Sequence, residues 1–441
     1  MATAIEYFKL LPKTNCKDCG QPTCLAFAML LANQKAKLED CPHVSGEAVE
    51  AMKESSAPPV NTVKVGTGEN AVAMGGENVL YRHERRFENP IAYAVSVSDS
   101  WDAPRIAEAV AKAKSLAFDR VGMVFRLDLV SVSNDSGESD EFLAAVDAVL
   151  ADWDLPIMFE INDVGVAEAA LSRHAALKPL VYAGETADVE AFAKLATKHG
   201  CPLGIRAKGV EAAADAAEIA AKAGCKDLVL DLGASNLKEC LEWQTIARRA
   251  AINRKFRPLG HPLMNRVGCG EYAVATAVLS TLKYGSLVVF DGLEPYEALP
   301  LFTLRQNIYT DPQVPIQVKQ DLYPIGDPGP HSPIMFTTNF SLTYFTVRAD
   351  IEKSKIPVWL QIVNTEGLSV LTAYSAGKFE PERVAAAFEE SGVLDKSDGP
   401  VVVPGLVARM SGKLSEEIGR DVVVGTNESK DIPKHLREIT S

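Results

Sequence analysis

Short apolar runs alternate with helix-forming segments through the middle of this chain. Segments such as 103–117, 186–199 and 210–223 are rich in alanine and space their apolar residues three or four apart, as amphipathic helices do. The runs between such segments are continuously apolar, which is typical of buried parallel strands. There are eight runs, at residues 91–97, 121–127, 156–161, 179–182, 202–206, 227–231, 257–260 and 286–290. Eight strands that alternate with helices predict a (β/α)8 barrel.

Polar residues follow several of these runs, and in such barrels the carboxyl ends of the strands hold the active site. They are Asp128, Asn162, Asp163, Arg206, Lys208 and Asp231. Polar strand ends also occur in barrels that serve only as scaffolds, so the pattern leaves both interpretations open.

Four of the eight cysteines lie near the start of the chain, in the spacing Cys16-x2-Cys19-x4-Cys24-x16-Cys41. Three thiols in one tight loop, followed by a helix at residues 25–38 and a fourth thiol, favour a [4Fe–4S] cluster. Structural zinc is the alternative, although paired zinc knuckles usually supply two CxxC units and this segment has one. A disulfide framework is less favoured, because so long a chain does not need one.

The other four thiols are scattered singly, and we expect them to be ordinary buried or half-buried cysteines. They are Cys201, Cys225, Cys240 and Cys269.

Two breaker-rich segments divide the chain. Residues 53–60 read KESSAPPV, and residues 325–333 place three prolines and two glycines in nine residues, so neither segment suits a regular element. We therefore expect a small cluster module at 1–58, a TIM-type barrel at 59–326 and a further domain at 327–441.

The last part again alternates strands and helices. Apolar runs at 335–339, 358–363, 401–403 and 421–424 are interspersed with helix-forming segments at 381–391, 406–418 and 430–439. This pattern predicts a doubly wound, Rossmann-like α/β domain. Gly367, Gly405 and Gly425 stand just beyond strand ends, where open α/β sheets bind ligands. Neither GxGxxG nor GxxxxGK[ST] is present, so a nucleotide is a weak interpretation.

A formal charge of −13 argues against nucleic acid or an anionic membrane as the main partner. No segment is apolar enough to span a bilayer, and no targeting segment precedes the cysteine motif. We expect a cytoplasmic protein.

Four segments carry a resemblance to a known family. They are NCKDCGQPTCLAFAM at 15–29, RQNIYTDP at 305–312, TTNFSLTY at 337–344 and GLSVLTAY at 367–374. Together, and in this order, they resemble the large (gamma) subunit of the corrinoid iron–sulfur protein of the acetyl-CoA decarbonylase/synthase (CO dehydrogenase/acetyl-CoA synthase) system.

The resemblance implies a methyl carrier of the reductive acetyl-CoA pathway. A base-off corrinoid of the cobalamin type would accept a methyl group from a methyl-pterin through a separate methyltransferase and donate it to acetyl-CoA synthase. The [4Fe–4S] cluster, fed by a donor such as ferredoxin, would restore Co(II) to Co(I). The family also implies a heterodimer with a small (delta) subunit.

The resemblance further implies which residues hold the cofactors. The cluster ligands would be Cys16, Cys19, Cys24 and Cys41, and Thr372 would lie beside the lower face of cobalt. The corrinoid-binding residues would be Thr338, Thr343, Tyr344, Gly367, Leu368, Ser369, Val370, Leu371, Thr372, Ala373, Tyr374, Gly405 and Gly425. No histidine stands in the Asp-x-His-x-x-Gly context that many corrinoid proteins use to ligate cobalt.

Two rival hypotheses remain at this point. In the first, the barrel itself binds methyl-pterin at Asn162, Asp163 and Asp231 and catalyses the transfer. In the second, the chain is a zinc-stapled scaffold whose last domain only docks partners.

Overall fold

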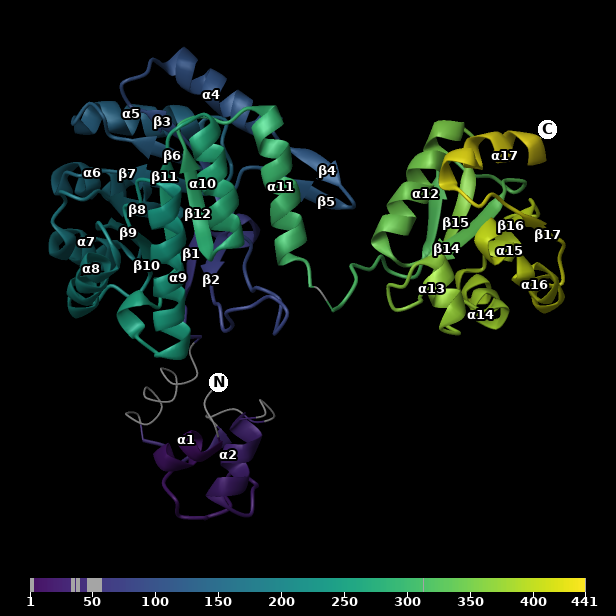
Figure 1. Cartoon of the computed structure of the whole chain (residues 1–441), viewed down its shortest axis with the longest axis horizontal. Helices are drawn as coiled ribbons and strands as arrows, with labels where there is room; N and C mark the ends of the chain where they lie inside the picture. The colour runs from purple at the N-terminus through teal and green to yellow at the C-terminus, as the bar shows by residue number, and fades with distance from the viewer. Residues whose placement is uncertain (1–3, 33–35, 37–39, 46–57, 312, 441) are drawn as a thin grey trace. The chain divides into compact units, whose positions relative to one another are not determined.

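The computed structural model describes residues 4–32, 36, 40–45, 58–311 and 313–440. By internal contacts, the chain forms two compact units, one of residues 1–116 with 126–309 and one of residues 117–125 with 310–441. Figure 1 labels their elements along the chain. No helix in the described ranges is both long and apolar enough to cross a membrane.

The N-terminal segment contains two short helices, α1 (Ala4–Leu10) and α2 (Cys24–Ala32), which pack against each other. Their contact buries Leu11, Phe27 and Leu31 together with two of the cysteines. The predicted helix at 25–38 is therefore confirmed as far as Ala32, and most of its remainder lies outside the described residues, as does most of the breaker-rich segment at 53–60.

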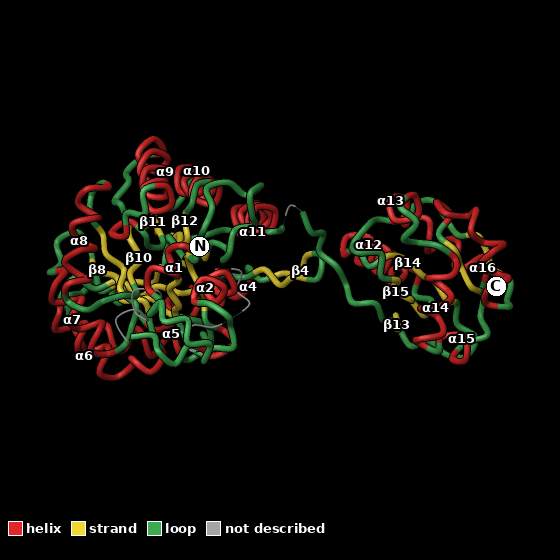
Figure 2. The backbone as a smooth tube through the Cα atoms, turned by 90° about the horizontal axis from the view of Figure 1, so that it is seen from below, coloured by secondary structure: helices red, strands yellow, loops and turns green. Residues whose placement is uncertain are grey.

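Eight parallel strands close into a barrel in the order β3-β6-β7-β8-β9-β10-β11-β12, and β12 pairs with β3. Each strand is followed by a helix, so the predicted barrel is confirmed, and Figure 2 shows its strands enclosed by helices. The strands are β3 (Ala92–Ser98), β6 (Leu129–Ser133), β7 (Ile157–Glu160), β8 (Leu180–Ala183), β9 (Leu203–Arg206), β10 (Leu228–Asp231), β11 (Leu263–Val267) and β12 (Gly285–Phe290). The helices are α4 (Ala103–Ser115), α5 (Ser139–Leu150), α6 (Val164–His174), α7 (Val189–His199), α8 (Val210–Lys222), α9 (Leu237–Asn253), α10 (Glu271–Leu282) and α11 (Pro295–Tyr309), with 3-10 turns η3 (Ala175–Leu177) and η4 (Arg257–Leu259).

An antiparallel hairpin of β1 (Thr62–Val65) and β2 (Val72–Gly75), joined through η2 (Gly68–Asn70), closes the amino end of the barrel. Its Val63, Val65 and Met74 are buried in the same core as the inward-facing side chains of the barrel strands. The hairpin thus plugs one end, and only the carboxyl end remains open for a ligand.

Two of the eight predicted barrel strands are wrong. Residues 121–127 contribute to a hairpin of β4 (Phe118–Arg120) and β5 (Met123–Phe125), because Val121 and Gly122 both have positive φ and make the tight turn. Residues 257–259 form the 3-10 turn η4, and Pro258 in its first turn favours this conformation. The true strands are β6 and β11, which have serine, asparagine and arginine among their apolar residues and so lack a continuous apolar run.

The second unit is built on a five-stranded sheet in the order β13-β15-β14-β16-β17, with β13 antiparallel and the other four parallel. The strands are β13 (Leu322–Ile325), β14 (Ile334–Thr338), β15 (Val358–Val363), β16 (Val401–Val403) and β17 (Val422–Val424). The helices are α12 (Ser341–Ser354), α13 (Val370–Ser375), α14 (Pro381–Ser391), α15 (Val393–Lys396), η5 (Gly405–Met410), α16 (Ser411–Ile418), η6 (Ser429–Asp431) and α17 (Ile432–Ile439). One core lies under α12 and α17 and a second under α13, α14 and α16, so helices cover both faces of the sheet.

The expected boundary at residue 326 falls after the start of this unit. β13 pairs with β15 through four residues, Leu322 to Ile325. The internal contacts of the chain also assign residues 310–441 to the C-terminal unit. The proline-rich segment that marked the boundary is thus a connection inside the unit, between β13 and β14.

Candidate functional site

The cysteine loop turns sharply at several residues with left-handed backbone conformation. Lys13, Asn15, Lys17 and Gly20 all have φ between 49° and 73°. The side chain of Asn15 accepts a hydrogen bond of 2.8 Å from the backbone N–H of Cys24, which ties the start of the loop to the first residue of α2. Left-handed residues that alternate with others can turn neighbouring backbone N–H groups toward one side, which suits negatively charged sulfur ligands.

The four cysteines differ in exposure. Cys24 and Cys41 are buried in the apolar cluster of the two helices, Cys19 is half-buried against it, and Cys16 is exposed. A centre held by these thiols would lie in apolar surroundings on one side and reach the surface at Cys16. Burial and access to solvent are among the factors that tune an iron–sulfur centre.

One exposed group of potential ligand atoms lies beside the loop. Among the described residues, the ligand atoms of Cys16, Asp18 and His43 lie within 4.8 Å of one another.

The acid beside Cys16 is itself paired. Asp18 Oδ2 lies 2.6 Å from His43 Nε2, and this hydrogen bond is the main reason that the pKa of Asp18 lies below its ordinary value.

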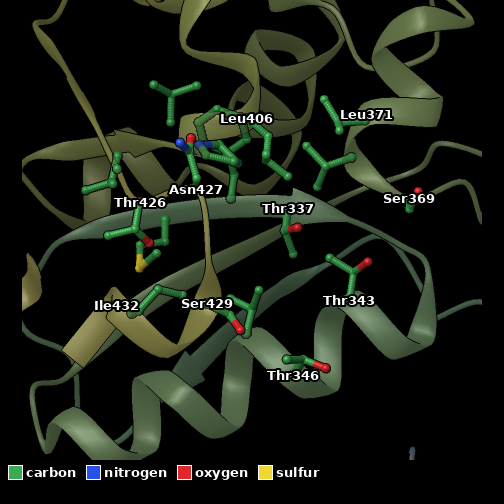
Figure 3. Close-up of a pocket in the computed structure, with 18 of the residues that line it drawn as sticks. Thr337, Thr343, Thr346, Ser369, Leu371, Leu406, Thr426, Asn427, Ser429 and Ile432 are labelled. Atoms are coloured by element: carbon green, nitrogen blue, oxygen red, sulfur yellow. The ribbon is translucent and has the colours of Figure 1, made fainter. Parts of the chain in front are cut away.

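A cavity of about 330 Å³ opens at the carboxyl ends of β14 and β16 in the second unit (Figure 3). Thr343 and Thr346 reach it from α12, Ser369 and Leu371 from the start of α13, and Leu406 from η5. The segment after β17 supplies Gly425, Thr426, Asn427 and Ser429, and Thr337, Leu342, Val402 and Ile432 complete much of the wall. Hydroxyl and amide groups are thus interspersed with aliphatic side chains, and no histidine is among the described lining residues.

Five of the residues that the resemblance selected line this cavity: Thr343, Ser369, Val370, Leu371 and Gly425. Gly367, Leu368, Thr372, Ala373, Tyr374 and Gly405 are near in sequence to lining residues but are not themselves in the wall. Thr372 is exposed in the first turn of α13, where its hydroxyl shares a hydrogen bond of 3.1 Å with Ser369.

Two predicted residues are buried and do not line the cavity. Thr338 is inaccessible to solvent, and its Oγ1 has no hydrogen-bond partner within the described structure. Tyr344 packs its ring 5.0 Å from that of Tyr323 and 4.8 Å from that of Phe345. Gly405 has a packing role, because a Cβ there would lie 2.6 Å from the carbonyl oxygen of Gly425.

Sequence reasoning missed several polar lining residues: Thr337, Thr346, Thr426, Asn427 and Ser429. Thr346 could have been predicted from its spacing alone, since it lies one turn after Thr343 on the same face of a helix. The residues after Gly425 follow a strand that ends at the same edge of the sheet as β14, and that topology was not visible in the sequence.

The carboxyl end of the barrel holds a second, more polar cavity of about 290 Å³. Glu160 accepts hydrogen bonds from the hydroxyls of Ser96 and Ser131 at 3.1 and 2.6 Å and from Arg266 Nε at 2.9 Å, and Arg266 also pairs with Asp291. Glu160 and Arg266 are therefore paired within the barrel.

Asp231 is buried in the same mouth. It accepts a hydrogen bond of 2.6 Å from Tyr182 and lies 3.8 Å from Arg206. Burial raises the pKa of its carboxyl group, and the hydrogen bond from Tyr182 partly opposes this shift.

Other polar candidates of the barrel have structural contacts. Asn162 accepts from the N–H of Gly184, and Asp163 caps α6. Lys208 is exposed. Asp128 was expected at a carboxyl end, but it precedes β6 and pairs with the buried Arg305 at the amino end, because residues 121–127 are not the barrel strand.

The remaining cysteines separate into two kinds. Cys201, Cys225 and Cys240 are buried as expected, and burial raises the pKa of each thiol to about 11. Cys269 is exposed, which corrects the expectation of burial: it lies between two glycines in the loop that joins β11 to α10.

Comparison with family models gives two matches. A model described as the CO dehydrogenase/acetyl-CoA synthase delta subunit matches residues 62–436, which is most of the chain. A model named for an Fe-S cluster matches residues 11–43, the segment that holds the four clustered cysteines.

Full-length relatives are also found. The chain is 41% identical over 438 residues to the corrinoid/iron-sulfur protein large subunit of Moorella thermoacetica, covering 99% of this chain and 98% of the relative. It is 35% identical to the acetyl-CoA decarbonylase/synthase complex subunit gamma of Methanopyrus kandleri, covering 99% and 97%.

Among solved structures, the chain is similar to a dihydropteroate synthase of Yersinia pestis, with a TM-score of 0.38 and 13% identity over 49% of this chain and 92% of that one. A dihydropteroate synthase of Thermus thermophilus gives a TM-score of 0.38 and 17% identity over 57% and 100%. Similarity at this level supports no further conclusion.

The exposure of the cysteines predicts an order of alkylation. In metal-depleted protein, Cys16 and Cys269 should react with iodoacetamide before Cys24 and Cys41, since only the first two are exposed. After reconstitution with iron and sulfide, Cys16 should become protected while Cys269 remains reactive. Mass spectrometry of the peptides measures both, and continued labelling of Cys16 at full iron loading would remove it from the ligand set.

Proposed function

Because the chain belongs to the family of corrinoid/iron–sulfur protein large subunits and acetyl-CoA decarbonylase/synthase gamma subunits, we propose that it is the methyl carrier of such a complex. In this proposal the cysteine module holds a [4Fe–4S] cluster and the C-terminal cavity holds a corrinoid. The methyl group comes from a methyl-pterin through a methyltransferase and goes to acetyl-CoA synthase. The observation that carries the proposal is the presence of both a four-cysteine module and an amphipathic cavity in one chain.

The composition of the cavity wall fits a corrinoid. The macrocycle is broad and apolar and bears amide side chains on its rim, which require both aliphatic surface and hydrogen-bonding groups. Leu342, Leu371 and Leu406 offer the first, and the threonines of α12 and the segment 425–429 offer the second. When bound, the corrinoid would supply a cobalt centre that carries the methyl group, and the cluster would supply low-potential electrons.

The role of the protein's own residues is then to position the corrinoid and to shield it from water. Aliphatic side chains at the mouth exclude water, and hydroxyls on successive turns of α12 fix the orientation of the ring. No histidine lines the described cavity wall, which supports a corrinoid without a nitrogen ligand from the protein. Thr372 does not line the cavity, but it follows the lining residue Leu371 and shares a hydrogen bond with the lining residue Ser369, so a corrinoid bound there would lie close to it.

The outer surface of the barrel has an exposed apolar face that could bind a partner subunit. No charged side chain occurs in α10 between Glu271 and Lys283, and Tyr272 is 82% exposed. The neighbouring α11 exposes Tyr296 and Leu299, and these two helices pack side by side. Exposed aromatic and aliphatic side chains that lie together are normally covered, so we propose that the small subunit of the family binds here.

The first test concerns the C-terminal cavity. Gly405→Ala should push the segment that begins at Gly425 outward, because overpacking of about 1–3 kcal/mol has no free space to relax into. We expect roughly tenfold weaker binding of hydroxocobalamin, measured by titration of its absorbance. Gly412→Ala is the matched control, since a Cβ there meets nothing within 4 Å. Equal affinity of both variants would contradict the placement.

The second test concerns the cluster. Cys19→Ala should abolish reduction of the bound corrinoid by a protein electron donor while corrinoid binding stays unchanged, because electrons would have no relay. Cys201→Ala, which removes a buried thiol of the barrel, is the control. Reduction is followed by absorbance under anaerobic conditions, and a Cys19→Ala variant that is reactivated at the normal rate would refute the relay.

The third test concerns the partner surface. Tyr272→Asp combined with Leu299→Asp should weaken association with the small subunit about a hundredfold, because exposed aromatic and aliphatic anchors dominate such interfaces. Ile219→Asp on α8, a similarly exposed aliphatic residue of the barrel, should leave it unchanged. Calorimetric titration measures both, and an equal loss in both variants would argue against this face.

A further inference from the structure

The charge of the cysteine module differs from that of the rest of the chain. Residues 1–45 contain five lysines and four acidic residues, a formal charge of +1, whereas the whole chain carries −13. Lys9, Lys13 and Lys17 are exposed, and the last two lie in the loop that leads into and past Cys16. A basic surface therefore adjoins the cysteine that reaches solvent.

These lysines have no carboxylate partner within the described structure. The acid nearest Cys16 is Asp18, whose Oδ2 lies 2.6 Å from His43 Nε2. Lys13 lies 5.7 Å from the ring centre of Phe8, an arrangement that leaves its ammonium group accessible. The positive charges are thus available to another molecule.

An apolar stripe lies on the same module. Leu25 and Met29 are four residues apart in α2, so they share one face, and they are 44% and 55% exposed. The sequence from Cys19 to Gln34 contains no charged residue at all. Since α2 starts at the third clustered cysteine, this stripe begins beside the metal-binding loop.

We propose that Lys9, Lys13, Lys17, Leu25 and Met29 form a docking surface for a small acidic electron-transfer protein. This inference rests on the proposed role of the cluster. In the electron-transfer step, one electron leaves the reduced iron–sulfur centre of the acidic partner protein, which is oxidised. The electron enters the cluster of the cysteine module, which is reduced, and no bond forms or breaks. Complexes of this kind have small interfaces and gain their rate from charge attraction.

The test is the rate at which the cluster of the full-length, reconstituted protein is reduced by an acidic ferredoxin, followed by stopped-flow absorbance. Lys13→Glu with Lys17→Glu should lower the second-order rate constant roughly tenfold at low ionic strength, with the difference lost at about 0.5 M salt. Lys222→Glu with Lys238→Glu on the barrel makes the same change in net charge and should have little effect. Met29→Ser should slow reduction at every salt concentration, because its contribution is apolar.

The outcomes separate the docking surface from the proposed function. Reduction by dithionite should be equal in all variants, which shows that the cluster is intact. An unchanged rate with ferredoxin in the Lys13/Lys17 variant, or an equal loss in the barrel control, overturns the docking surface. If the cluster accepts electrons by this route but the corrinoid is never reduced, the relay fails and the surface stands. If the Lys13→Glu/Lys17→Glu variant loses iron, a second variant, Lys9→Glu with Lys13→Gln, replaces it in the same measurement, because these changes lie farther from the cysteines.

Discussion

Parallel strands that each lead into a helix determine where this chain can hold a ligand. Their carboxyl ends gather at one edge, together with helix N-termini and the loops between them, and both cavities described above lie at such an edge. The β1–β2 hairpin plugs the opposite end of the barrel with Val63, Val65 and Met74. The same topology thus produces two candidate sites, and their side chains decide between them.

The two cavities differ in the kind of polar group that lines them. In the barrel, Glu160, Arg266 and Asp291 bond one another, and Tyr182 donates to the buried Asp231. A ligand there would have to break these contacts. No charged side chain is among the described lining residues of the C-terminal cavity, which presents threonine, serine and asparagine side chains among leucines. The hydroxyls of Thr346, Ser369 and Thr426 bond only to backbone oxygens or to a neighbouring hydroxyl. This contrast favours the barrel as scaffold and the last unit as the binding domain.

Much of this organisation was predictable from the sequence, for identifiable reasons. Cysteine spacing selected the cluster module, and the alternation of apolar and helical segments gave the barrel. The failures came where local pattern and tertiary role diverged. Val121 and Gly122 look like part of an apolar strand but turn a hairpin, whereas Asn265 and Arg266 hid a true strand because their polar groups bond within the barrel. Thr426 and Asn427 reach the cavity only through the order of strands, which one sequence does not reveal.

A protein that joins a four-cysteine iron–sulfur cluster and a corrinoid in one chain has a characteristic metal content. Iron, sulfide, zinc and cobalt per chain can be measured in anaerobically purified protein. We expect about four irons with equal sulfide, together with about one cobalt. Zinc in place of iron, without cobalt, would contradict both cofactor assignments, and iron without cobalt would contradict the assignment of the C-terminal cavity.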